Sequence, residues 1–155
     1  MGLVETLKGN RVYFDTNIFI YIIEGSLQYQ TIINELTKSI IQKDFESYTS
    51  YITLTEILPP LVKRGDKNII SGTIDFIRGK DFFHLTTANE EICLQAGFLR
   101  GALGMKTPDS LHVATAIKQN CDLFLTNDAG IRVPKNMRHI LLSEFCSDQL
   151  VNDKL

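Results

Sequence analysis

Four carboxylates occupy positions in the chain from which they can meet at one site: Asp15, Glu56, Asp109 and Asp128. Asp15 directly follows the strand-like run at residues 12–14, and Asp128 lies just past a second run at 123–125. Glu56 falls within a helical stretch, and Asp109 falls in the first turn of another. Clustered carboxylates repel one another, so one of them takes up a proton unless a cation is bound. The four positions together therefore predict a divalent metal site.

The ligand type indicates which metal and which chemistry to expect. Carboxylate oxygens without histidine or cysteine suit Mg²⁺ or Mn²⁺ and not zinc. Magnesium is typically held by one or two carboxylates, with water and substrate phosphate completing its coordination. Four carboxylates can hold two ions roughly 3.5–4 Å apart, as in many enzymes that cleave phosphodiester bonds. We therefore expect Asp15, Glu56, Asp109 and Asp128 to be the catalytic, metal-binding residues of a nuclease.

Taken one at a time, three of these residues have a purely structural explanation. Asp109 in a first helical turn interacts favourably with the helix dipole, by roughly 0.3–1 kcal/mol. Asp15 and Asp128 each fit a turn residue that follows a strand. Glu56 is different, because it lies among apolar residues of its helix, where a lone carboxylate needs a partner or carries a desolvation cost. The metal hypothesis thus depends on the four residues as a group.

Alternating strand-like and helical segments predict the scaffold that positions these side chains. Short apolar runs with β-branched or aromatic residues are typical of buried parallel strands; they are residues 11–14, 46–50, 82–85, 123–125 and 139–142. Helical periodicity covers residues 32–41, 52–62, 69–77 and 92–103. Thr107 and Pro108 predict an N-cap and a first helical position for a helix that runs to about Gln119. The pattern favours a parallel sheet with helices on both faces, whose ligands bind beyond the carboxyl ends of the strands.

Size and composition set broad limits on the class of protein. A chain of 155 residues has the usual size of one domain, and its 44% hydrophobic and 22% charged residues argue against disorder. We expect one domain at residues 10–146, with short terminal extensions at 1–9 and 147–155. No apolar run is long enough to span a bilayer, and the first residues do not resemble a secretory signal. These features favour a cytoplasmic protein whose three cysteines are reduced.

The net charge of −2 gives only weak support for a nucleic-acid partner. Without the four candidate site carboxylates, the rest of the chain carries a charge of +2. Basic residues close to the candidate ligands are the best positions for contacts with RNA phosphates, and these are Lys106 and Arg132. For any single basic residue, a solvated surface position is the commoner role.

Four segments of the chain resemble the motifs of PIN domains in order and spacing. They are residues 12–19 (VYFDTNIF), 55–58 (TEIL), 107–116 (TPDSLHVATA) and 123–128 (LFLTND). The match spans roughly residues 11–142. It implies an α/β fold, a three-layer α/β/α sandwich around a central, mainly parallel, roughly five-stranded sheet. It also implies RNA cleavage with Mg²⁺ or Mn²⁺. Small single-domain members are often VapC-type toxins, usually homodimers that a cognate antitoxin protein inhibits.

The resemblance extends to small polar residues beside the acids, with one departure. Asn17, Thr126 and Asn127 match the family's polar residues near the metal, and Thr16 stands beside them. All four are equally well explained as capping or turn residues. Many members carry one more acid shortly after the fourth motif, whereas residues 129–132 here are AGIR. A second metal is therefore less well supported than a first.

Other readings of the sequence remain open. A PIN-like domain that has lost catalysis would serve as an RNA-binding or assembly module, and a processing nuclease would have no link to toxin–antitoxin biology. An aspartate-based phosphatase also begins with an acid after its first strand, but it needs a second one two residues on, where Asn17 stands. His112 shares a helix face with Asp109, and packing is a commoner role for it than catalysis. The pair Pro59-Pro60 is expected to kink or break its helix, and the two helices around it are a candidate surface for a dimer or an antitoxin.

Overall fold

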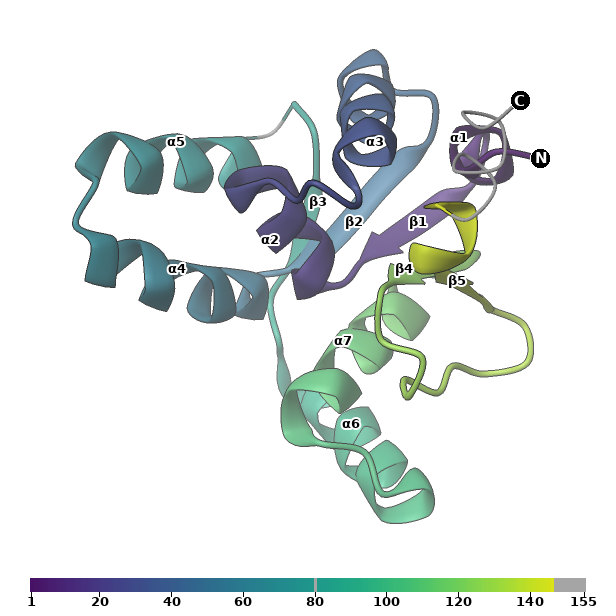
Figure 1. The fold of residues 1–155 in the computed structure, drawn as a ribbon. Helices are drawn as coiled ribbons and strands as arrows, with labels where there is room; N and C mark the ends of the chain where they lie inside the picture. The colour runs from purple at the N-terminus through teal and green to yellow at the C-terminus, as the bar shows by residue number, and fades with distance from the viewer. Residues whose placement is uncertain (80, 147–155) are drawn as a thin grey trace.

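A parallel five-stranded sheet forms the centre of the described part of the protein, residues 1–79 and 81–146 of a computed structural model (Figure 1). Its strands are β1 (Arg11–Phe14), β2 (Glu46–Ser50), β3 (His84–Thr86), β4 (Leu123–Thr126) and β5 (Arg138–Leu141). They lie in the order β3-β2-β1-β4-β5, and every neighbouring pair is parallel. Because β1 and β4 are neighbours, the ends of the two strands that precede Asp15 and Asp128 lie together.

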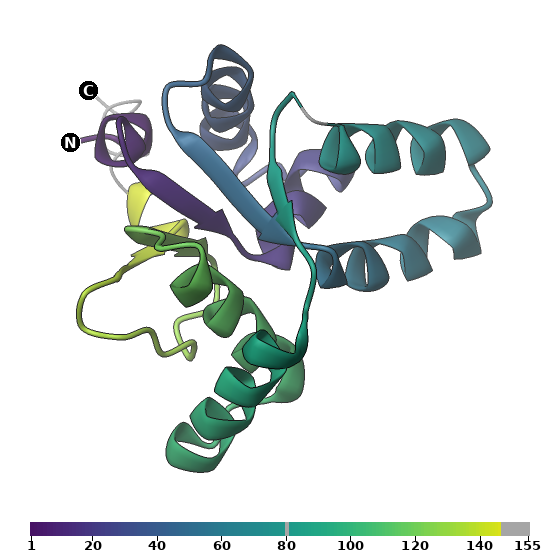
Figure 2. The same ribbon diagram turned by 180° about the vertical axis from the view of Figure 1, so that it is seen from behind.

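Helices cover both faces of the sheet (Figures 1 and 2). They are α1 (Leu3–Leu7), α2 (Thr16–Glu24), α3 (Gln30–Gln42), α4 (Ile52–Arg64), α5 (Lys67–Arg78), α6 (Glu90–Leu103) and α7 (Thr107–Lys118). Helices α4 and α5 run side by side as an arm that extends from the sheet. Helices α6 and α7 form a second pair, and α7 packs on the face of the sheet opposite to α2 and α3. The predicted three-layer α/β/α sandwich with a parallel five-stranded sheet is confirmed.

Strand β1 divides its side chains between two cores. Val12 and Phe14 point into the core with α1, α2 and α3, whereas Tyr13 points into the core with α7 and the segment after β4. This alternation is the period of two that a strand imposes on its side chains. Residues 12–14 are therefore buried on both faces of the sheet, which explains why this part of the strand is a continuous run of Val, Tyr and Phe.

Of the two terminal extensions predicted from the sequence, the structure describes only the first. Residues 1–9, expected as an extension, contain α1, and its Leu3 and Leu7 are buried in the main core. The extension expected at 147–155 lies outside the described residues. Within the described ranges, no helix is long and apolar enough to cross a membrane.

Two local predictions about helices need correction. The pair Pro59-Pro60 does not break its helix, because α4 continues from Ile52 to Arg64 with both prolines inside it. Ile57 and Leu61 are buried on either side of the pair, and this packing offsets the backbone hydrogen bonds that proline cannot donate. Helix α7 has Lys106 as its N-cap, so Thr107 is its first residue and not its cap.

Candidate active site

Asp15 is held in one orientation at the carboxyl end of β1. Its backbone N–H donates to the carbonyl of Leu125 on β4, at 3.0 Å, and the residue is the N-cap of α2. Oδ1 accepts from the backbone N–H of Thr16 at 2.8 Å, and Oδ2 accepts from the Thr126 hydroxyl at 2.7 Å. The side chain of Asn17 reaches Oδ2 at 3.4 Å. Asp15 is only 5% exposed, and neutral groups supply these hydrogen bonds, so its charge remains available to a cation.

Thr126, the fully buried last residue of β4, links the two ends of the site. While its hydroxyl donates to Asp15, it accepts from the Asn17 side chain at 3.1 Å and from the backbone N–H of Asp128 at 3.0 Å. Asp128 itself is exposed, and its Oδ1 accepts from the Gly130 N–H at 2.8 Å. The Thr126 hydroxyl thus fixes the turn that brings Asp128 next to Asp15.

Glu56 reaches the same region from α4 and has two partners there. Its Oε1 accepts from the Thr16 hydroxyl at 2.8 Å and from His112 Nε2 at 2.6 Å. Burial by itself raises the pKa of Glu56, but the hydrogen bond and charge of His112 and the hydrogen bond from Thr16 together lower it below the ordinary value. The sequence predicted that Glu56 needs a partner because it lies in an apolar helix, and that partner is His112 on α7.

Asp109, in the first turn of α7, has a pKa above its ordinary value, as expected for an acid with other acids nearby. Burial raises its pKa first, and the charges of Asp15 and Asp128 raise it further. Glu56 adds a smaller effect in the same direction, which the charge of His112 opposes. The charges of the other three predicted carboxylates therefore all act on Asp109, although the four residues come from four segments of the chain.

A cleft of about 360 Å³ opens beside this cluster. Asp109 and Asp128 line it, and so do the two basic residues predicted to contact phosphate, Lys106 and Arg132. Both basic side chains are exposed. The cleft thus combines acidic groups that attract a cation with basic groups that attract an anion, as binding of a metal and a phosphodiester requires.

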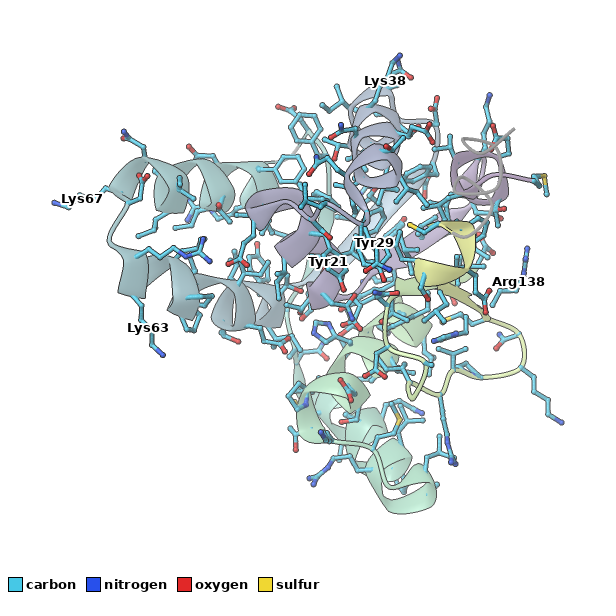
Figure 3. The ribbon with its side chains drawn as sticks, viewed as in Figure 1. Tyr21, Tyr29, Lys38, Lys63, Lys67 and Arg138 are labelled. Atoms are coloured by element: carbon cyan, nitrogen blue, oxygen red, sulfur yellow. The ribbon has the colours of Figure 1, made fainter. Side chains whose placement is uncertain are left out.

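Asn127 contributes to the framework around the site. Its side-chain amide donates to the hydroxyls of Tyr21 and Tyr29, at 2.9 and 3.2 Å, and its Oδ1 accepts from the N–H of Ser143. Figure 3 shows the two tyrosines side by side near the centre of the molecule, and their rings lie 4.9 Å apart. The backbone N–H of Asn127 donates to Asn17 Oδ1 at 3.1 Å. In this structure the Asn127 side chain therefore ties α2 to the chain after β5.

The chemistry of the donor set fits a divalent cation. Across residues 1–79 and 81–146, no three His, Cys, Asp or Glu side chains stand close enough together to hold a metal ion as they are placed. The raised pKa of Asp109, caused by burial and then by the neighbouring carboxylates, shows that like charges are crowded here. A hard cation with oxygen ligands relieves such crowding. Asp15, Asp109, Asp128 and Glu56 are the residues that would hold it.

Two site residues were not identified as such by sequence reasoning. The sequence indicated that His112 faces Asp109 or packs in the core, but its hydrogen bonds go to Glu56 and to Tyr13. Tyr13 lies in β1 and is fully buried, with its hydroxyl 2.6 Å from His112 Nδ1. The available signal was one polar-tipped side chain between Val12 and Phe14 in an apolar strand.

Comparisons with known proteins agree with this geometry. The profile of the PIN domain family matches residues 12–136. Among solved structures, VapBC2 from Rickettsia felis bound to promoter DNA contains a chain 21% identical, with a TM-score of 0.62, over 83% of this chain and 96% of that one. FitAcB from Neisseria gonorrhoeae is 16% identical, with a TM-score of 0.63, over 85% and 98%.

A third structure comes from a toxin whose target is known. VapC20 of Mycobacterium tuberculosis, a toxin that cleaves the sarcin–ricin loop, is 14% identical with a TM-score of 0.60, over 73% of this chain and 86% of that one. At these identities the likeness establishes the fold. A search of curated proteins gave no match.

Proposed function

The chain belongs to the PIN-domain family, and from this premise we propose that it is an endoribonuclease that depends on Mg²⁺ or Mn²⁺ and cleaves single-stranded or looped RNA. The observation that carries the proposal is the electrostatic coupling of Asp109 to Asp15, Asp128 and Glu56 at the carboxyl edge of the sheet. Such crowding of like charges is unfavourable for folding unless a bound cation neutralises them. RNA as substrate is inferred from the family and from the basic residues in the cleft.

The residues have distinct roles in this proposal. A bound divalent cation supplies a Lewis acid for the phosphodiester and lowers the pKa of water. Asp15, Asp109, Asp128 and Glu56 bind the cation, and Thr16, Asn17 and Thr126 hold Asp15 and Glu56 in place through their hydrogen bonds. Lys106 and Arg132, which also line the cleft, hold the phosphate backbone.

Metal dependence is the direct test of this function. We expect the purified protein to cleave unstructured RNA in the presence of Mg²⁺ or Mn²⁺ and to lose that activity in excess chelator, with recovery when the metal is restored. The measurement is the rate of cleavage of an end-labelled RNA on a denaturing gel. Full activity in chelator would refute the proposal. Absence of metal binding by the folded protein in calorimetry would instead favour a module that binds RNA without cutting it.

Lys106 and Arg132 give a second prediction. Replacing both by alanine should raise KM for RNA by about 10-fold and change kcat less, because phosphate contacts supply affinity without taking part in bond cleavage. The slope of log affinity against log salt should become shallower by roughly 0.7 for each phosphate that is no longer neutralised by a basic side chain.

The matched control for this pair is the double variant Lys63→Ala/Lys67→Ala. Both lysines are exposed and lie at the far end of the arm made by α4 and α5, away from the cleft (Figure 3). Their replacement removes the same charge from the chain and should leave KM and the salt dependence unchanged. Equal effects in the two double variants would show that only net charge matters.

We further propose that the protein is the toxin of a toxin–antitoxin pair and acts in the cytoplasm as a homodimer. Several proteins of this fold were solved as VapBC complexes of toxin and antitoxin. An apolar groove between α2 and α4, lined by Ile20, Ile23 and Ile57 among others, lies close to the predicted partner surface. A short neighbouring reading frame for a DNA-binding antitoxin would support this role, whereas an isolated gene would favour a processing nuclease. Light scattering of the purified protein tests the dimer.

A further inference from the structure

Tyr13 and His112 form a buried pair that ends on a candidate metal ligand. Tyr13 is fully buried and His112 is 1% exposed. The Tyr13 hydroxyl lies 2.6 Å from His112 Nδ1, and His112 Nε2 lies 2.6 Å from Glu56 Oε1. Nε2 also lies 3.1 Å from the Thr16 hydroxyl and 3.9 Å from Asp15 Oδ1. The two side chains thus connect the core on the α7 side of the sheet to the Glu56 carboxylate.

Hydrogen-bond roles in this chain follow from the acceptor at its end. An ionised carboxylate can only accept, so Nε2 must carry the proton that it shares with Glu56. When the imidazole is neutral, Nδ1 is an acceptor and the Tyr13 hydroxyl donates to it; when the ring is charged, both nitrogens are donors and Nε2 still donates to Glu56. Burial, followed by the nearby charge of Asp15, raises the pKa of Tyr13 well above its ordinary value, so this hydroxyl keeps its proton. In the neutral ring, Tyr13 therefore selects the tautomer of His112 that donates to Glu56.

The consequence for Glu56 is that its two carboxylate oxygens are unequal. Within the described residues, the hydrogen bonds to this side chain come from Thr16 and His112, and both end on Oε1. The side chain is 32% exposed, so the group keeps access to solvent. Two donors on one oxygen fix the plane of the carboxylate and leave Oε2 as the oxygen free to bind a cation or a water molecule.

We infer that Tyr13 and His112 are positioning residues, which hold the Glu56 carboxylate by Oε1 and so present Oε2 to the metal. This inference rests on the proposed function for the identity of the cation, but the hydrogen-bonded chain itself is made by the protein's own side chains. Partners of metal ligands that lie outside the coordination sphere commonly change metal affinity or activity by about 10- to 100-fold when they are removed.

Packing alone does not account for the two polar groups. The Tyr13 ring stacks on Phe124 with centroids 5.1 Å apart, and a phenylalanine in its place would keep that contact. A buried hydroxyl and a buried imidazole each carry a desolvation cost that an apolar core residue lacks. Their joint hydrogen bonds are directed at Glu56, so the specific contribution of the two groups is to orient that carboxylate.

The variant Tyr13→Phe tests the inference, with Tyr48→Phe as its matched control. Tyr48 pairs directly with Tyr13 across β1 and β2 and is also buried, but its hydroxyl donates to Glu46, away from the site. We expect Tyr13→Phe to weaken Mn²⁺ binding by about 10-fold in calorimetry without RNA and to lower kcat with little change in KM. Tyr48→Phe should leave the Mn²⁺ affinity and kcat as they are.

A second readout needs neither metal nor substrate. In ¹⁵N-histidine-labelled, metal-free protein, long-range ¹H–¹⁵N spectra recorded at a pH where the His112 ring is neutral should show the Nε2–H tautomer, and Tyr13→Phe should reduce that preference. Replacement of His112 provides a further check, since His112→Gln keeps an N–H donor and should retain more Mn²⁺ affinity than His112→Leu. Circular dichroism establishes that each variant is folded.

The outcomes separate this inference from the proposed function. If the protein fails to cleave RNA but Tyr13→Phe alters the His112 tautomer and the Mn²⁺ affinity, the positioning role stands and the nuclease proposal fails. If the protein cleaves RNA while Tyr13→Phe and Tyr48→Phe both match the unmodified protein in Mn²⁺ affinity, tautomer and kcat, the positioning role is refuted.

Discussion

Replacing Asp15 by asparagine is expected to reduce kcat for RNA cleavage by at least about 100-fold, the loss that follows when a few kcal/mol of metal-derived transition-state stabilisation disappears. Asp15 is the most buried of the four candidate ligands and is held by Thr126, Thr16 and Asn17. Asparagine has the same shape and keeps one carbonyl oxygen, which can still accept from the Thr16 N–H that begins α2, but it replaces the second acceptor by an NH2 group and removes the charge. The fold should therefore survive while metal binding and cleavage are lost. Calorimetry with Mn²⁺ and gel-based cleavage rates measure the two effects.

The chain offers a closely matched control for this variant. Asp66 is also the N-cap of a helix, where its side chain accepts from the N–H groups of Asn68 and Ile69 at the start of α5. Asparagine is as good an N-cap as aspartate, so Asp66→Asn removes one charge from an equivalent local structure away from the site. It should leave Mn²⁺ affinity and cleavage unchanged. Substantial cleavage by a folded Asp15→Asn protein would remove Asp15 from the set of essential ligands.

Predictions that depend on local patterns agree best with the structure. The runs at residues 11–14 and 46–50 coincide with β1 and β2, because each is short and contains the β-branched or aromatic residues that strands favour. The third run begins two residues later than expected, at His84, since Phe82 and Phe83 pack in or against the core before the strand starts. Strand ends in turn placed Asp15 and Asp128 at the same edge of the sheet.

Contacts between segments that are distant along the chain could not be predicted from the sequence. A carboxylate in an apolar helix predicted that Glu56 has a partner, but only the fold shows that the partner is His112, 56 residues away. Helix α1 was missed because five residues give no helical periodicity, and its burial depends on its packing against α3. The Asn127 side chain bonds to Tyr21 and Tyr29 because α2 packs against β4, which Asn127 directly follows. These are tertiary facts that override local preference.

The effect of replacing Asp109 on the stability of the protein can distinguish a structural role from a functional one. A structural acid stabilises the fold, whereas an acid kept for metal binding destabilises it when no metal is bound. In the first turn of α7 its charge is stabilised by the helix dipole, by roughly 0.3–1 kcal/mol. Burial and the charges of Asp15 and Asp128 act against that and raise its pKa. Because the folded protein then binds this proton more tightly than the unfolded chain does, the stability that Asp109 contributes is present at low pH and is lost as the pH rises through its raised pKa.

We therefore expect Asp109→Asn to raise Tm of the metal-free protein at neutral pH by a small amount and to flatten its loss of stability between acidic and neutral pH. The same substitution should lower kcat for cleavage by at least about 100-fold, because a ligand charge is removed. Mg²⁺ should raise Tm of the unmodified protein more than that of the variant, since binding to the folded state alone is stabilising. Thermal unfolding with and without metal measures these shifts, with the exposed Asp75→Asn as a control that changes neither. A lower Tm for metal-free Asp109→Asn would mean that the helix dipole outweighs the repulsion and that Asp109 serves α7, not a metal.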